Sequence, residues 1–215
     1  INIFNFELMN FPILSSLILL PIIGSLFLLL SKDKNSNTGK YVALFTSFVN
    51  FLISIYLWYQ FDPTTSDFQF VEDREWLKGF INYKVGIDGI SILFIVLTSL
   101  ITPLCIISVN NTVKDRLRDF LIAILVMESL MIGVFCSLDL VIFYLFFEAG
   151  LIPMFLIIGI WGGARRVYSA FKFFLYTLLG SVLMLIAIIS IYWISGTTDI
   201  TQLYELGIDT KYQNL

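Results

Sequence analysis

Of the 215 residues of the chain, 58% are hydrophobic and only 13% are charged, whereas a soluble domain carries roughly 25% charged residues. The composition therefore excludes a soluble globular protein, and a formal net charge of -3 without a basic face excludes a nucleic-acid-binding protein. The two cysteines, Cys105 and Cys136, lie far apart and the chain has no histidine, which excludes the common zinc, haem and iron–sulfur ligand sets.

The apolar residues form runs about 20 residues long, and a helix of that length crosses the roughly 30 Å hydrocarbon core of a bilayer. The pattern predicts an all-α fold, a polytopic transmembrane helix bundle of about six spans that form a single transmembrane domain over residues 1–215. In chain order, the expected spans cover residues 11–30, 41–61, 87–109, 120–137, 138–160 and 170–194. Because the chain begins with Ile and stops after a polar stretch, we expect it to be a fragment of a longer protein.

Basic residues gather in the loops after the first, third and fifth spans. They are Lys32, Lys34, Lys40, Lys114, Arg116, Arg118, Arg165 and Arg166. The loop after the second span, residues 62–84, is acidic instead and contains several aromatic residues. The positive-inside rule then places the N-terminus on the outer side of the membrane. We expect the acidic loop to lie at the membrane surface, either as a solvated loop with aromatic anchors or as a short helix or hairpin.

The turn between the fourth and fifth spans, residues 136–139, is very short, which predicts adjacent antiparallel helices. Asp139 begins the fifth span and Asp88 begins the third span. Aspartate at a helix start is an ordinary capping residue, because its carboxylate accepts hydrogen bonds from the first backbone N–H groups. Capping is therefore the better explanation for both residues.

Two glutamates fall inside the expected spans. Glu148 lies nine residues after Asp139, or about 14 Å into the fifth span, and Glu128 lies at comparable depth in the fourth. A carboxylate at that depth costs on the order of 2.5–3.5 kcal/mol. Burial favours its protonated form and a nearby lysine favours its charged form. A glutamate subject to both effects can take up and release a proton, so we expect both residues to transfer protons.

The alternative for each glutamate is a hydrogen bond that joins two helices. For Glu128 the two interpretations are equally good. For Glu148 proton transfer is favoured, because Pro153 leaves the carbonyl of Ala149 without its usual donor and Gly150 allows water or another backbone to come close. Lys172, near the start of the sixth span, is a weaker candidate for proton transfer, and it is long enough to reach the membrane surface instead.

Several motifs resemble one family of membrane proteins. They are residues 86–91 (GIDGIS), 102–105 (TPLC), 146–154 (FFEAGLIPM), 161–163 (WGG) and 171–181 (FKFFLYTLLGS). In this order and spacing they resemble the antiporter-like subunit family of respiratory complex I, called chain 4 in mitochondria and chain M in bacteria. The resemblance covers most of the chain from about residue 85 to 187.

The resemblance implies a subunit of a proton-translocating NADH:quinone oxidoreductase in a bacterial cytoplasmic or mitochondrial inner membrane. It implies no cofactor in this chain, since NADH, FMN, iron–sulfur clusters and quinone bind to partner subunits. The expected partners are the other complex I membrane subunits and the lipid bilayer, with no nucleic acid. Glu148 matches the family's essential glutamate of the fifth helix, which pairs with a lysine on a seventh helix that this sequence does not reach.

Two other functions compete with this one. A subunit of a cation/proton antiporter or of a membrane-bound hydrogenase shares the glutamate of the fifth helix and needs neither NADH nor quinone. A purely structural membrane scaffold is the third possibility, and it predicts that both Glu128 and Glu148 can be replaced by Gln without loss of activity.

Overall fold

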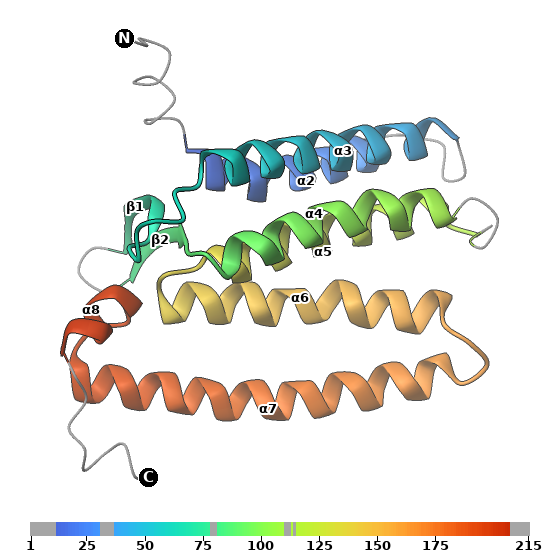
Figure 1. Cartoon of the computed structure of the whole chain (residues 1–215). Coiled ribbons are helices and arrows are strands. Elements are labelled where there is room, and N and C mark those ends of the chain that lie inside the picture. Colours follow the sequence, from blue (N-terminus) through green and yellow to red (C-terminus); the bar gives the residue numbers. More distant parts are fainter. Residues whose placement is uncertain (1–11, 31–36, 78–80, 110–112, 114, 207–215) are drawn as a thin grey trace, which may run out of the picture.

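The computed structural model describes residues 12–30, 37–77, 81–109, 113 and 115–206 (Figure 1). Within these residues, six helices are long and apolar enough to cross a membrane, as the sequence predicted. They are α2 (Ile13–Leu30), α3 (Asn37–Gln60), α4 (Ser91–Ser108), α5 (Leu117–Cys136), α6 (Leu140–Trp161) and α7 (Arg166–Ser195). A short helix, α8 (Ile200–Leu206), follows. The basic loop residues Lys32, Lys34 and Lys114 lie outside the described residues.

The helices differ from the expected spans at some ends. The third helix begins at Ser91 rather than at residue 87, because residues up to Ile87 belong to a strand and a turn at Gly89 and Ile90 comes before the helix. The Asp88 carboxylate accepts a 2.7 Å hydrogen bond from the backbone N–H of Ser91, as expected for a capping residue. The sixth helix begins four residues earlier than expected, at Arg166.

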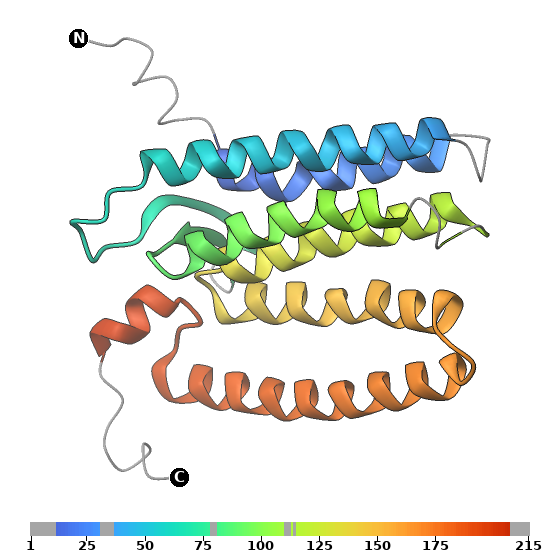
Figure 2. The same ribbon diagram turned by 45° about the vertical axis from the view of Figure 1, so that its right-hand side comes forward.

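The bundle divides into a packed part, helices α2 to α5, and an open edge, helices α6 and α7. Figures 1 and 2 show α2 and α3 on one side, α4 and α5 next to them, then α6, and α7 at the far edge. Helix α5 contacts α2, α3, α4 and α6, so it is the central helix of the bundle. Helix α7 packs along α6, and only Ala170, Ser181 and Ile188 of its residues are buried.

Two apolar clusters fill the packed part, one near each end. The first joins α2 to α5 near the starts of α2 and α4, and it includes Leu17, Leu57, Ile95 and Ile132. The second lies toward the opposite ends of the same helices. It consists of Leu28, Ala43, Ile106, Leu121 and Leu125. On every one of the four helices, the residues between the two clusters include buried polar side chains.

The acidic loop after α3 forms a β-hairpin, one of the expected alternatives. Strand β1 (Gln69–Leu77) pairs antiparallel with β2 (Ile81–Ile87), and the register shifts between Gln69 and Glu72 and between Glu75 and Leu77. The Glu72 carboxylate accepts hydrogen bonds from the backbone N–H groups of Leu14 (2.8 Å) and Ser15 (3.3 Å). A carboxylate at a helix N-terminus satisfies backbone donors that the helix itself cannot, so this contact fixes the hairpin on α2.

The turn between α5 and α6 is as tight as its sequence predicted. The Asp139 carboxylate accepts hydrogen bonds from the backbone N–H groups of Val141 (2.8 Å) and Ile142 (3.2 Å), which confirms its capping role. A Cβ atom at Gly133 would lie 2.6 Å from the ring of Phe146. The glycine therefore allows α5 and α6 to pack at close range beside the turn.

Candidate functional site

Glu128 lies in the polar layer between the two apolar clusters. Its side chain on α5 is only 2% exposed, and its Oε1 atom accepts a 2.9 Å hydrogen bond from Nδ2 of Asn50 on α3. Its Oε2 atom is buried without a hydrogen-bond partner among the described residues, and so is Oδ1 of Asn50. The pair thus has one hydrogen bond and two buried acceptor atoms without a partner.

The same layer contains a set of smaller polar groups. The hydroxyls of Ser54 on α3 and Ser99 on α4 lie 2.6 Å apart, within hydrogen-bond distance. Ser129 on α5 donates a 2.5 Å hydrogen bond to the carbonyl of Ile18 on α2. These bonds join α3 to α4 and α5 to α2, and in an apolar bundle such bonds fix the rotation of each helix about its axis.

Asn50 and its serine neighbours were missed by sequence reasoning. Ser47, Asn50 and Ser54 are spaced by three and four residues, which places them on one face of α3, and all three are 0% exposed. A polar stripe at helical spacing inside an apolar span is the signal that could have found them. Their partner, Glu128, lies 78 residues further along the chain and only the fold identifies it.

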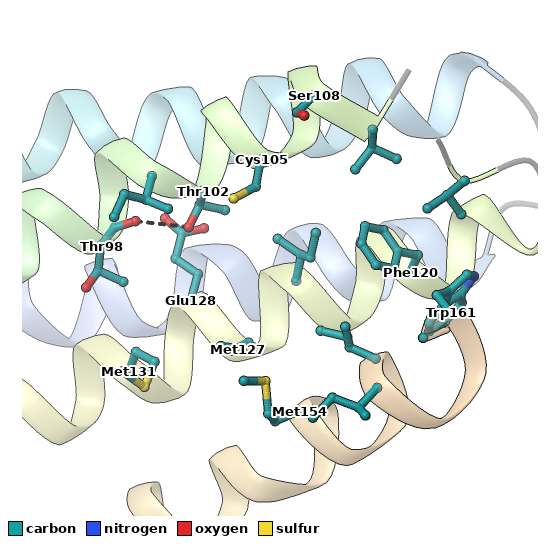
Figure 3. Close-up of a pocket in the computed structure, with 17 residues that line it drawn as sticks. Thr98, Thr102, Cys105, Ser108, Phe120, Met127, Glu128, Met131, Met154 and Trp161 are labelled. Atoms are coloured by element: carbon teal, nitrogen blue, oxygen red, sulfur yellow. Dashed lines mark hydrogen bonds between the residues drawn. The ribbon is translucent and has the colours of Figure 1, made fainter. Parts of the chain in front are cut away.

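A groove of about 830 Å³ runs between α4, α5 and α6, and Glu128 lies in its wall (Figure 3). Helix α4 lines it with a row of small polar side chains, namely Thr98, Thr102, Cys105 and Ser108. Methionines 127, 131 and 154 line the opposite wall. Toward the end where α4 stops and α5 begins, the lining includes Phe120 and Trp161, whose rings meet edge to face at 5.1 Å. The groove therefore extends from the level of Glu128 to that end of the bundle.

Glu148 lies on α6 in a more open environment. Its side chain is half-buried, and its Oε2 atom is shielded from solvent without a hydrogen-bond partner among the described residues. A Cβ atom built on Gly150 would have no neighbouring atom within 4 Å, so there is open space two residues away. Pro153 lies inside α6, where it has no N–H to donate to the carbonyl of Ala149.

The two glutamates lie at the same depth in the bundle. Glu128 is eight residues before the end of α5, and Glu148 is eight residues after the start of α6. Both are therefore about 12 Å from the short turn that joins these antiparallel helices. The sequence had predicted comparable depth, and the boundaries of the two helices agree with that prediction.

The fold does not pair Lys172 with either glutamate. Its exposed side chain extends toward Tyr168, with Nζ 5.9 Å from the ring centre, and no ion pair joins it to a glutamate within the described residues. Lys172 lies six residues into α7, roughly 9 Å from the end of the bundle, while Glu148 lies 13 residues from the same end, roughly 20 Å away. About 10 Å along the bundle axis therefore separates them.

The end of the bundle at the hairpin is held by charged contacts. Lys84 on β2 donates a 2.7 Å hydrogen bond to the carboxylate of Asp199, which precedes α8, and both side chains are largely buried. Burial alone would raise the pKa of Asp199, but hydrogen bonds from Lys84 and Thr201 outweigh it and keep that pKa below its ordinary value. The hairpin, the α5–α6 turn and the end of α7 thus lie together at one end, as the alternation of charged loops predicted.

No group of three or more His, Cys, Asp or Glu side chains in the described part of the chain could hold a metal ion. A membrane-spanning bundle with two carboxyl groups at one depth, one buried and one half-buried, is typical of an integral membrane protein that handles ions or protons.

Known proteins place this bundle in a family. Residues 137–215 match the family described as NADH:quinone oxidoreductase/Mrp antiporter, TM. The chain is 59% identical over 171 residues to NADH-quinone oxidoreductase subunit M of Rhodobacter capsulatus, covering 80% of this chain and 32% of that protein. It is 48% identical over 204 residues to NADH-ubiquinone oxidoreductase chain 4 of Marchantia polymorpha, covering 94% and 41%. The chain thus belongs to the family of these subunits, and it spans about two fifths or less of their length.

Solved structures agree in fold. A chain of respiratory complex I from Thermus thermophilus with bound NADH superimposes with a TM-score of 0.76 at 29% identity, covering 91% of this chain and 40% of that chain. A chain of an archaeal membrane-bound sulfane sulfur reductase superimposes with a TM-score of 0.79 at 17% identity, covering 92% and 40%, and shares the fold alone.

Proposed function

We propose that this chain is part of a proton-translocating membrane subunit of an NADH:quinone oxidoreductase. Electron transfer from NADH to quinone takes place in partner subunits, which bind FMN, the iron–sulfur clusters and the quinone. The chain lies in a bacterial cytoplasmic or mitochondrial inner membrane with its N-terminus and the β-hairpin on the outer side. The similarity to subunit M and chain 4 sequences, at 48% to 59% identity, supports this proposal.

The observation that carries the proposal is the setting of Glu148. Its carboxyl group is about 12 Å inside α6 and has one unpartnered oxygen. The carbonyl of Ala149, the next residue, lacks its usual helical donor because Pro153 has no N–H. Water that reaches this part of α6 can hydrogen-bond to both the carboxyl and the carbonyl of Ala149. A hydrated carboxyl inside an apolar bundle can exchange its proton with that water, whereas a dry one cannot.

The direction of proton movement depends on charge near Glu148. A cation brought close favours the ionised carboxylate and releases its proton, and withdrawal of the cation favours proton uptake. Lys172 is too far along the axis to pair with Glu148 in this arrangement, so we assign it the smaller role of a mobile cation near the basic end of the bundle. A conformational change in a partner subunit that moves a cation would then drive the proton.

The test is Glu148→Gln in the assembled complex, with proton pumping and NADH oxidation measured in membrane vesicles. Glutamine keeps the size and hydrogen-bonding capacity of the side chain but cannot carry a proton. We expect pumping to fall by about a hundredfold or more, the usual range for loss of a group that transfers a proton. The matched control is Glu205→Gln on α8, an exposed glutamate outside the spans, which should leave pumping unchanged.

Two results would contradict the proposal. Normal pumping in the Glu148→Gln complex would remove the assigned role of this residue. If the protein instead belongs to a cation/proton antiporter, deletion of the subunit would abolish cation/proton exchange and leave NADH oxidation intact. The family description includes Mrp antiporters, which makes this second outcome the relevant alternative.

A further inference from the structure

The polar layer of the packed part contains a carboxyl group that the proposed function does not use. Glu128 is 2% exposed and Asn50 is 0% exposed, so neither side chain can exchange its hydrogen-bond partner for bulk water. Together they offer two unpartnered oxygen atoms, Glu128 Oε2 and Asn50 Oδ1. A carboxylate and an amide oxygen are both acceptors only, so the pair lacks a donor.

Within the part of the chain that the structure describes, no cation forms an ion pair with Glu128. Helices α2, α4 and α6 contain no Lys or Arg, and the whole chain has no His. The bases on the helices that contact Glu128 are at their ends: Lys40 is ten residues before Asn50 on α3, and Arg118 is ten residues before Glu128 on α5. Each separation corresponds to about 15 Å along the helix. Among the residues of α4 and α6 that line the groove beside Glu128, the titratable one is Cys105, and it is not basic.

A single proton on the Glu128 carboxyl removes both problems. It cancels a charge that has no counter-ion, and it supplies one O–H donor to a pair that has an acceptor to spare. We propose that Glu128 and Asn50 form a carboxylic acid–carboxamide pair that stores a proton in the middle of the bundle. The proton comes from water as Glu128 changes from the carboxylate to the carboxylic acid, and it returns to water when the acid ionises.

The groove provides the route for that exchange. Thr98, Thr102, Cys105 and Ser108 are spaced by three or four residues, so they form a polar row along one face of α4. The row runs from the level of Glu128 to the end of α4, where the loop to α5 is basic. Water held along these side chains connects the carboxyl to that end of the bundle, which the charge pattern places on the inner side.

The consequence for transport rests on the proposed function. Glu128 and Glu148 lie at equal depth on neighbouring antiparallel helices, each about 12 Å from the α5–α6 turn. One holds a proton beside a neutral amide, and the other lies where a cation can approach. Glu128 thus acts as a store beside the pathway through Glu148, and the groove connects this store to the inner side.

The experiment compares the wild-type complex with Glu128→Gln and Ser99→Ala, using infrared difference spectroscopy and proton pumping per electron. We expect a protonated-carboxyl C=O band at neutral pH in the wild type, absent in Glu128→Gln and retained in Ser99→Ala. Ser99→Ala is the matched control, because it removes a hydrogen bond in the same layer but no titratable group. Pumping should fall several-fold in Glu128→Gln and stay normal in Ser99→Ala.

The outcomes separate this proposal from the proposed function and from a structural role. An ionised Glu128 at neutral pH, or normal pumping in Glu128→Gln, overturns the proton store, whatever Glu148→Gln shows. A purely structural hydrogen bond predicts equal effects for Glu128→Gln and Ser99→Ala. If Glu128→Gln does not assemble, Asn50→Leu decides, because the carboxyl band must move to the frequency of an acid without that partner, and an unmoved band overturns the pair.

Discussion

The packed helices α2–α5 and the open pair α6–α7 differ in how they treat a buried glutamate. In α5, 44% of the apolar stretch is buried within the protein, against 17% in α6 and 11% in α7. Glu128 lies in the packed part and has a hydrogen-bond partner, whereas Glu148 lies in the open part and has none among the described residues. The same side chain at the same depth thus has a hydrogen-bond partner in one region and none in the other.

This difference shows that depth alone does not determine the environment of a membrane carboxyl group. Burial against neutral partners favours a stored proton, because the neutral acid avoids an uncompensated charge. An open position beside a helix irregularity allows water and a mobile cation to come close, so the proton can be exchanged. The two regions meet at the α5–α6 contact.

The largest effect is expected from a substitution that breaks the contact between α5 and α6. Gly133→Leu places side-chain atoms where the Phe146 ring already lies 2.6 Å from an ideal Cβ, so α6 must move away from α5. We expect a loss of about 3 kcal/mol from the free energy of unfolding, as for severe overpacking. Thermal unfolding of the purified chain in detergent micelles measures it.

The control for this change is Gly180→Leu on α7, where a Cβ atom would meet nothing within 4 Å. We expect little or no loss of stability there, because the added side chain has open space. Equal destabilisation by the two substitutions would show that the contrast between the packed and the open region is false.

A smaller effect is expected from Asn50→Leu. This change removes the donor to Glu128 Oε1 and leaves the carboxyl without a hydrogen bond in the packed part. A buried polar group left without its partner costs about 2 kcal/mol, measured by the same thermal unfolding. Ser190→Ala on α7 also removes a side-chain hydrogen bond, but an exposed one to the helix backbone, and should change stability by less than about 0.5 kcal/mol.

The smallest effect concerns the contact that ties the end of α7 to the hairpin. Asp199→Asn removes the charge that pairs with Lys84 and should cost about 1 kcal/mol near neutral pH. Because the pKa of Asp199 is lowered in the folded protein, its contribution is present above the ordinary value of about 3.9 and is lost as the pH falls through the folded value. Unfolding temperatures between about pH 3 and about pH 7 should therefore converge for the two proteins at the acidic end. A constant difference across this range would contradict the shift.

The sequence by itself determined the six spans, their alternation across the membrane and the depth of both glutamates. These features follow from the length of apolar runs and the rise of a helix, which need only local information. Capping by Asp139 was predictable for the same reason, since its partners are the next few backbone N–H groups. The motifs around Glu148 also indicated the family.

The tertiary structure decided which side chains meet. The pairing of Asn50 with Glu128 depends on the rotation of α3 and α5 about their axes, and that rotation results from the packing of four helices at once. The hairpin, one of the expected alternatives, was selected by its contact with the start of α2, through Glu72. The distance of Lys172 from Glu148 likewise depends on how α6 and α7 align. Contacts between residues far apart in the chain are set by the packing of whole helices, which no local pattern specifies.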